Sequence, residues 1–290
     1  ADALAKYGIK VMLYLPSNPP HSACWDETGD PNGYGYFSDY LVTKEVFDYT
    51  PGTDGVPSQR ARKVLSEMVE WWSLHYGDKI AGWWFDGFYH SGAGSQLDMS
   101  LEYNVSTLAN AAKAGNPYSI VTFNRGMGDA RYQKVTEYTD YTAGECTGLD
   151  GYPVDGRWAA GTTDCQNFMF GPLGSRNNWS NGWGCSGINH QDVNEVVSFV
   201  DGALARDHVI GLDVKVNVFG QIDPDQYEQL EAVHEFQENQ DGTEITLNKD
   251  SLTLENVGDR GIIKYSGIRM SDLDVEISDA SVAELREGTG

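Results

Sequence analysis

The hydrophobic positions alternate along the chain between helical and strand-like segments. Helical spacing of apolar residues predicts helices over residues 58–76, 98–113, 192–206 and 224–236. Short apolar runs predict six strands, at residues 9–15, 80–86, 119–124, 138–145, 167–170 and 209–219. Apolar strands between helices are typical of a parallel sheet that is buried on both faces. Both a doubly wound sheet and a barrel fit this α/β pattern.

The two ends of the chain depart from this alternation. Residues 1–8 have the pattern of a helix end that stops at Gly8, so we expect the first residue to be a cut. Beyond about residue 240 no helical pattern remains, and the segments ITL, SLTL and VEISDASVAEL resemble the bacterial Ig-like group 2 module. We therefore expect two domains, a (β/α) barrel over residues 1–240 and a partial all-β Ig-like segment over residues 241–290.

Charge and cysteine content exclude several classes of partner. With 43 acidic against 20 basic residues, the formal net charge is −23, which disfavours nucleic acid and anionic membranes. No apolar run approaches the roughly 18 residues of a membrane span, so we expect no membrane insertion. The four cysteines form no CxxC pair, so we expect no metal and no cofactor, while one or two disulfides remain possible.

The strongest candidate for chemistry is Asp86, which ends the apolar strand 80–86 and is followed by Gly87. The C-terminal ends of parallel strands are where the catalytic groups of barrel enzymes gather. A carboxylate there is costly to bury unless a function or a partner requires it. An aspartate at this position also suits the N-cap of a following helix, so its position alone leaves both roles open.

A second carboxylate is needed for glycoside hydrolysis, which uses a pair of acids on either side of the scissile bond. The segment 137–145 offers Glu137, Asp140 and Glu145. Glu145 lies at the end of the predicted strand, as Asp86 does, and is the expected acid/base. Glu137 is the next candidate, and a structural role is expected for Asp140.

Five segments in sequence order resemble the α-L-fucosidases of glycoside hydrolase family 29, over roughly residues 1–236. They are YGIKVMLYL (7–15), GWWFDG (82–87), NR (124–125), DYTAGE (140–145) and KVNVFGQI (215–222). The resemblance implies a (β/α)₈ TIM barrel with Asp86 as the nucleophile and Glu145 as the acid/base. The first two strands of that family are missing here, so we expect a partial barrel of about six strands.

Six further residues are candidates for substrate binding, from the resemblance and from their positions near the predicted strand ends. They are His21, Trp25, Tyr89, His90, Arg125 and Trp183. Ordinary packing is an open alternative for the loop histidines and for the two tryptophans, because both residue types also serve in loops and cores.

The expected function is that of a retaining exo-glycosidase that releases terminal α-L-fucosyl residues by double displacement. Its partner would be a fucosylated oligosaccharide or glycoconjugate, and its location extracellular, cell-surface or periplasmic in a bacterium. Two alternatives remain. One is another barrel glycosidase, similar to an α-galactosidase, and the other is a carbohydrate-binding surface protein without catalysis.

Overall fold

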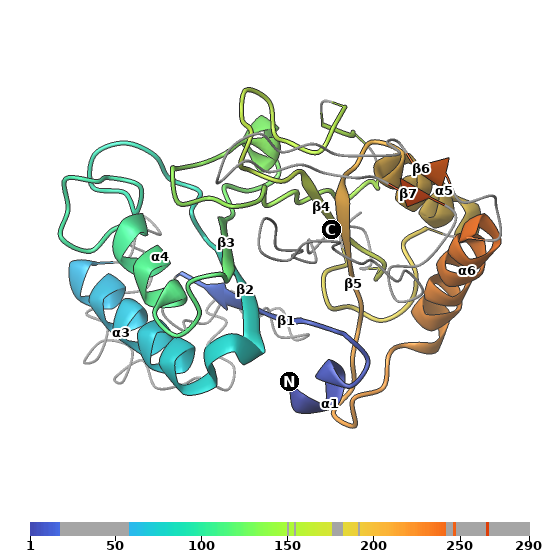
Figure 1. Cartoon of the computed structure of the whole chain (residues 1–290), viewed down its shortest axis with the longest axis horizontal. Coiled ribbons are helices and arrows are strands. Elements are labelled where there is room, and N and C mark those ends of the chain that lie inside the picture. The colour runs from blue at the N-terminus through green and yellow to red at the C-terminus, as the bar shows by residue number, and fades with distance from the viewer. Residues whose placement is uncertain are drawn as a thin grey trace, which may run out of the picture. The chain divides into compact units, whose positions relative to one another are not determined.

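The computed structural model describes residues 1–17, 58–149, 151–153, 155–175, 182–190 and 192–241, with short strands at 246–247 and 265–266 (Figure 1). The chain divides into two compact units. The first comprises Ala1–Pro172 and Gly202–Asp213, and the second comprises Leu173–Asp201 and Val214–Gly290.

Five parallel strands form the framework of the first unit. β1 (Val11–Pro16), β2 (Ile80–Asp86) and β3 (Ile120–Phe123) pair in that order, and β4 (Phe168–Pro172) pairs with β5 (Val209–Asp213). Every one of these pairings is parallel, as the apolar strands between helices predicted. Within each of the two groups, the carboxyl ends of the strands therefore point the same way.

The predicted strand over residues 138–145 forms only isolated bridges, yet it connects the two groups of strands. At its start, the Asp140 amide donates to the Val121 carbonyl of β3 at 2.8 Å. At its end, Glu145 forms a parallel bridge with Phe170 of β4. The segment thus lies between β3 and β4 and runs in the same direction as both. The described residues contain six parallel segments in one row, and their place in an eight-stranded barrel stays a prediction.

Gly144 allows this segment to approach β4 closely. Its φ is 66°, and a Cβ built on it would lie 1.9 Å from the Phe168 carbonyl oxygen. A side chain at this position would meet both an unfavourable backbone conformation and a backbone atom that cannot move independently. This accounts for a glycine directly before Glu145.

The variant Gly144→Ala should therefore lower the free energy of unfolding by more than about 3 kcal/mol. Gly161→Ala is the matched control, because Gly161 has a φ of 73° but open space around its Cβ position. It should cost only about 1 kcal/mol. Urea denaturation of both variants tests this, and equal losses would show that the close approach to Phe168 is unimportant.

Two helices cover one face of β1–β3 in the first unit (Figure 1). They are α3 (Gln59–Tyr76), which Ser58 caps, and α4 (Val105–Lys113). Trp83 and Phe85 of β2 are buried against them, while Trp84 packs on the opposite face with Tyr141 and Phe168. β2 is therefore buried on both faces, which explains its unbroken apolar sequence.

Two predicted boundaries differ from the structure by six or more residues. The helix predicted over residues 98–113 begins only at Val105, because the Asn104 side chain and Thr107 form a capping box that starts it there. The strand predicted over residues 209–219 ends at Asp213. Beyond it, the Asn217 side chain accepts hydrogen bonds from the Phe219 and Gln221 amides and folds the chain into a turn.

The remaining elements are short or lie in the second unit. They are α1 (Asp2–Ala5), the 3₁₀ helices Gly77–Lys79 and Asp129–Tyr132, α5 (Val193–Leu204), α6 (Pro224–Asp241), β6 (Thr246–Leu247) and β7 (Tyr265–Ser266). β6 and β7 pair antiparallel. Most of residues 241–290 lies outside the described residues, so the Ig-like segment remains a prediction. The cysteines of the described part, Cys146, Cys165 and Cys185, form no disulfide.

Candidate active site

Asp86 lies at the carboxyl end of β2 with four hydrogen-bond donors around its carboxylate. Its Oδ1 accepts from the Gly87 amide at 2.7 Å, the Tyr89 hydroxyl at 2.7 Å and Asn124 Nδ2 at 2.9 Å. Its Oδ2 accepts from the Tyr14 hydroxyl at 2.6 Å. Gly87 has a φ of 87°, so the chain makes the sharp turn expected after the strand. A carboxylate held by this many donors has a fixed orientation.

Two tyrosine rings flank this carboxylate. Tyr14 and Tyr89 are 55% and 51% exposed, respectively, although both hydroxyls are bonded to Asp86. Burial of the hydroxyls, together with the nearby Asp86, raises the pKa of both phenols, so they remain donors at neutral pH. The Tyr14 ring stacks on Trp84, with centroids 5.2 Å apart. The site therefore offers aromatic surface beside an anionic centre.

Glu145 is the second acidic residue of the site and is partly buried. Its Oε2 accepts a hydrogen bond from Asn124 Nδ2 at 2.9 Å. Burial raises the pKa of the Glu145 carboxyl, and the negative charge of Asp86 adds to this. The Asn124 hydrogen bond and the positive charge of Arg131 oppose the rise. Glu145 consequently holds its proton to higher pH than an ordinary glutamate.

The two acidic side chains share one amide nitrogen. Asp86 Oδ1 and Glu145 Oε2 each lie 2.9 Å from Asn124 Nδ2, so their separation is at most twice that distance. The N–H bonds of a planar amide diverge by about 120°, which places the two oxygens about 5 Å apart. Both side chains therefore face the same side of the site.

The other two acids of the segment lie away from Asp86. Asp140 is bonded near the start of β3, where it forms an ion pair with Lys113 at 2.7 Å. Glu137 precedes it in an exposed turn. Because the segment runs parallel to β3, both acids belong to the end of the sheet opposite to Asp86. Of the three candidate acids, the fold brings only Glu145 to that carboxylate.

The raised pKa of Glu145 predicts a pH-dependent stability. The folded state binds its proton more tightly than the unfolded state, so this group contributes stability below the ordinary carboxyl pKa of 4.5 and loses it as the pH rises. Glu145→Gln, which cannot ionise, should unfold at a higher temperature than the wild type at pH 7. Near pH 4 the two should differ little.

Thermal denaturation between pH 4 and pH 8 checks this expectation. Glu137→Gln serves as the control, because its side chain is exposed and its replacement should leave the curve unchanged. A Glu145→Gln curve parallel to that of the wild type would contradict the raised pKa.

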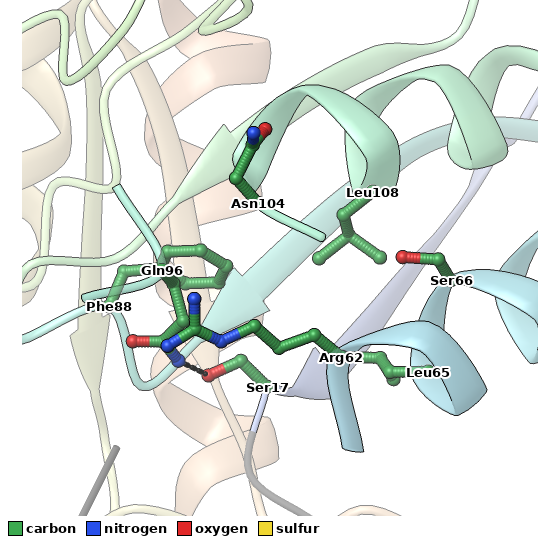
Figure 2. A pocket seen from close by; sticks show the side chains of 8 residues that line it. All are labelled: Ser17, Arg62, Leu65, Ser66, Phe88, Gln96, Asn104 and Leu108. Carbon is green, nitrogen blue, oxygen red and sulfur yellow. Dashed lines mark hydrogen bonds between the residues drawn. The ribbon is translucent and has the colours of Figure 1, made fainter. Parts of the chain in front are cut away.

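Gln96 stabilises the turn after Asp86 through two hydrogen bonds. Its Nε2 donates to the Ser17 hydroxyl at 2.8 Å, as Figure 2 shows, and to the Gly87 carbonyl at 3.3 Å. Ser17 in turn donates its amide to the Asp86 carbonyl at 2.8 Å. Gln96 thus connects the ends of β1 and β2. The cavity in Figure 2 holds about 10 Å³, which is close to the minimum for one water molecule and too small for a sugar.

The six residues predicted to bind substrate differ in where the structure places them. Tyr89 contacts Asp86, whereas no hydrogen bond or ion pair of the described chain joins Arg125 to Asp86 or Glu145. His90 is exposed, and no hydrogen bond or ion pair joins it to either acid in the described part of the chain. Trp183 belongs to the second unit. His21 and Trp25 lie outside the described residues, and the binding roles of all six stay predictions.

Four residues of this site carry no role in the sequence analysis: Tyr14, Gln96, Asn124 and Arg131. The positions of Tyr14 and Asn124 relative to Asp86 follow from the strand register. Tyr14 pairs with Trp84, two residues before Asp86. Asn124 directly follows Phe123, which pairs with Phe85, the residue before Asp86. A polar side chain on the face that carries Asp86 could have been inferred from strand alternation. Gln96 and Arg131 come from loops, which periodicity does not place.

The described residues contain neither a cluster of metal ligands nor a helix suited to span a membrane. No group of three or more His, Cys, Asp or Glu side chains among them is arranged to hold a metal ion. None of their helices combines the length and the apolar character that a membrane crossing requires.

Solved structures with a similar fold are glycoside hydrolases. The endo-fucoidan hydrolase MfFcnA9 of glycoside hydrolase family 107 aligns with 80% of this chain at 15% identity and a TM-score of 0.55. The related MfFcnA4 aligns with 80% at 14% identity and a TM-score of 0.53. This chain shares the fold of these two enzymes. An α-L-fucosidase, isoenzyme 1 from Paenibacillus thiaminolyticus, aligns with 82% at 18% identity and a TM-score of 0.50.

The chain spans only 46%, 39% and 50% of these three proteins, respectively. No protein-family model matches the sequence, and no curated protein matches it at a significant level. The similarity is therefore one of fold, and it includes both endo-fucoidan hydrolases and an α-L-fucosidase.

Proposed function

We propose that this chain carries the catalytic site of a retaining glycoside hydrolase acting on α-L-fucosyl groups. The observation that carries the proposal is the pair of carboxylates on one amide, with oxygens about 5 Å apart. Retaining enzymes place their two carboxyl groups about 5–5.5 Å apart, whereas inverting enzymes need about 6.5–9.5 Å to admit a water molecule.

The two acids take different roles because their surroundings differ. Asp86 would attack the anomeric carbon, while the proton of Glu145 moves to the departing oxygen and the glycosidic bond breaks. Glu145 would then remove a proton from water, whose oxygen attacks the same carbon and releases Asp86. A raised pKa suits Glu145 for the first proton transfer. The four donors around Asp86 hold its carboxylate in one orientation, which suits a nucleophile.

The sugar is proposed to be fucose for two reasons. The proteins of similar fold named above include an α-L-fucosidase and enzymes that act on fucoidan. The half-exposed rings of Tyr14 and Tyr89 beside Asp86 also provide flat apolar surface, which suits a sugar with a methyl group in place of a hydroxymethyl group.

Turnover of nitrophenyl α-L-fucoside, compared with nitrophenyl α-galactoside and other aryl glycosides, tests the proposal. We expect the fucoside to be the preferred substrate and proton NMR to show α-L-fucose as the first product. A preference for the galactoside would support an α-galactosidase-like enzyme. Binding of fucose without turnover of any glycoside would support a carbohydrate-binding protein, and a β anomer as first product would exclude retention.

An endo-acting enzyme on a fucose polymer is the second candidate. The endo-fucoidan hydrolases align with higher TM-scores than the α-L-fucosidase does, 0.55 and 0.53 against 0.50. Incubation with fucoidan distinguishes the two activities. An endo-enzyme shortens the polymer before monosaccharide appears, whereas an exo-enzyme releases fucose while the chain length changes little.

A further inference from the structure

The orientation of the Asn124 amide is determined by a contact on its other side. Its Oδ1 accepts a hydrogen bond from the Gly126 amide at 2.8 Å. A backbone N–H can only donate, so the oxygen must face Gly126 and the NH₂ group must face the two acids. Both hydrogens of that NH₂ group are then used, one on Asp86 and one on Glu145.

The backbone of Asn124 is fixed to the strand that carries Asp86. Its amide donates to the Phe85 carbonyl at 2.8 Å, and its carbonyl accepts from the Phe88 amide at 2.9 Å. The residue has no exposed surface. Asn124 therefore moves with the residues on either side of Asp86, and its side chain extends from there to Glu145.

We propose that Asn124 is a positioning residue that sets the separation of Asp86 and Glu145 and keeps it in the range of a retaining enzyme. The inference deepens the proposed function and rests on it. The geometry points to a bridge between the two acids, because one rigid, buried amide donates to both.

A neutral hydrogen-bond donor suits the position between Asp86 and Glu145. Two carboxylates about 5 Å apart repel each other when both are ionised, and a shared N–H donor stabilises the pair without adding charge. A lysine or arginine in this place would keep Glu145 ionised and unable to deliver a proton. The Asn124 hydrogen bond lowers the pKa of Glu145, but burial and the charge of Asp86 leave that pKa raised.

The charged and titratable groups around Glu145 come from three elements and from the loop after β2. Asp86 from β2 raises its pKa, and Arg131 from the 3₁₀ helix Asp129–Tyr132 lowers it. The Tyr14 and Tyr89 phenols are affected by its charge in turn. The Asn124 hydrogen bond lowers the pKa of Glu145, whereas burial and Asp86 raise it. Without that hydrogen bond, the Glu145 carboxyl should therefore titrate at higher pH.

The test uses Asn124→Ala and Asn124→Asp, with Thr122→Val as the matched control. Thr122 is equally buried on β3, and its hydroxyl donates to the Tyr141 carbonyl at 2.6 Å without contacting either acid. Carbon-13 NMR of the Glu145 carboxyl follows its titration independently of turnover. Steady-state kinetics on the aryl fucoside give kcat, KM and the pH profile.

Both Asn124 variants should shift the Glu145 titration and the basic limb of the pH profile to higher pH. At the optimum, kcat should fall about 100-fold with KM little changed, as for a small misplacement of catalytic groups. The control should lose stability but keep the titration and the pH profile of the wild type. Asn124→Asp has the shape of the native side chain and serves as the folded variant if the alanine variant unfolds.

A Glu145 titration equal to that of the wild type in a folded Asn124 variant would overturn this inference. The NMR result does not depend on activity. A wild-type protein inactive on every fucoside would refute the proposed function, while the titration would still report on the bridge.

Discussion

Asp86→Ala should lower the turnover of an aryl α-L-fucoside by roughly 10⁴-fold or more, because the change removes the proposed nucleophile. The fold should survive the change. Asp86 is a partly exposed residue at a strand end, so water can reach the donors that it leaves behind, the Gly87 amide and the side chains of Tyr14, Tyr89 and Asn124. Steady-state kinetics and circular dichroism measure the two effects.

Asp98→Ala is the control for this variant. Asp98 is a partly exposed aspartate of the same unit that accepts hydrogen bonds from Gly94 and Ser100, and its loss should leave turnover unchanged. Added azide should restore part of the activity of Asp86→Ala and give the β-fucosyl azide, because azide then attacks the face from which Asp86 would attack. Ordinary activity in Asp86→Ala would show that the nucleophile lies elsewhere.

Glu145→Ala should show a loss that depends on the leaving group. For a substrate with a poor leaving group, such as an unactivated disaccharide, loss of the general acid should cost about 10²–10⁴-fold. For a fluoride or a dinitrophenyl glycoside, which needs no proton, the first step should be nearly normal and the fucosyl-enzyme should accumulate. Burst kinetics with the activated substrate detect this intermediate.

Azide distinguishes this role from that of Asp86. With Glu145→Ala it should attack the fucosyl-enzyme and give the α-fucosyl azide, the opposite anomer from that of Asp86→Ala. Glu137→Ala is the matched control, since that exposed glutamate lies at the other end of the sheet and should behave as the wild type. An equal loss for all leaving groups in Glu145→Ala would contradict its role as acid.

Local sequence patterns were sufficient for the elements with strong signals. The strand Ile80–Asp86 has the predicted bounds, because both faces are covered and its sequence carries no polar break. The helix Gln59–Tyr76 starts directly after its serine cap. The helix predicted from residue 98 begins only at Val105, because the capping box at Asn104 and Thr107 overrides apolar spacing.

The sequence by itself determined the parallel α/β character of this chain and placed Asp86 at a strand end, because apolar runs and a following glycine are local features. It also identified Glu145 as a candidate from its strand-end position. Only the tertiary structure decided which acid meets Asp86. The segment that carries both glutamates runs parallel to β3, so Glu145 lies at the same end of the sheet as Asp86 and Glu137 at the other end. The buried side-chain amide of Asn124 then connects Asp86 and Glu145. Such contacts join residues 21 to 72 positions apart, and no local pattern encodes them.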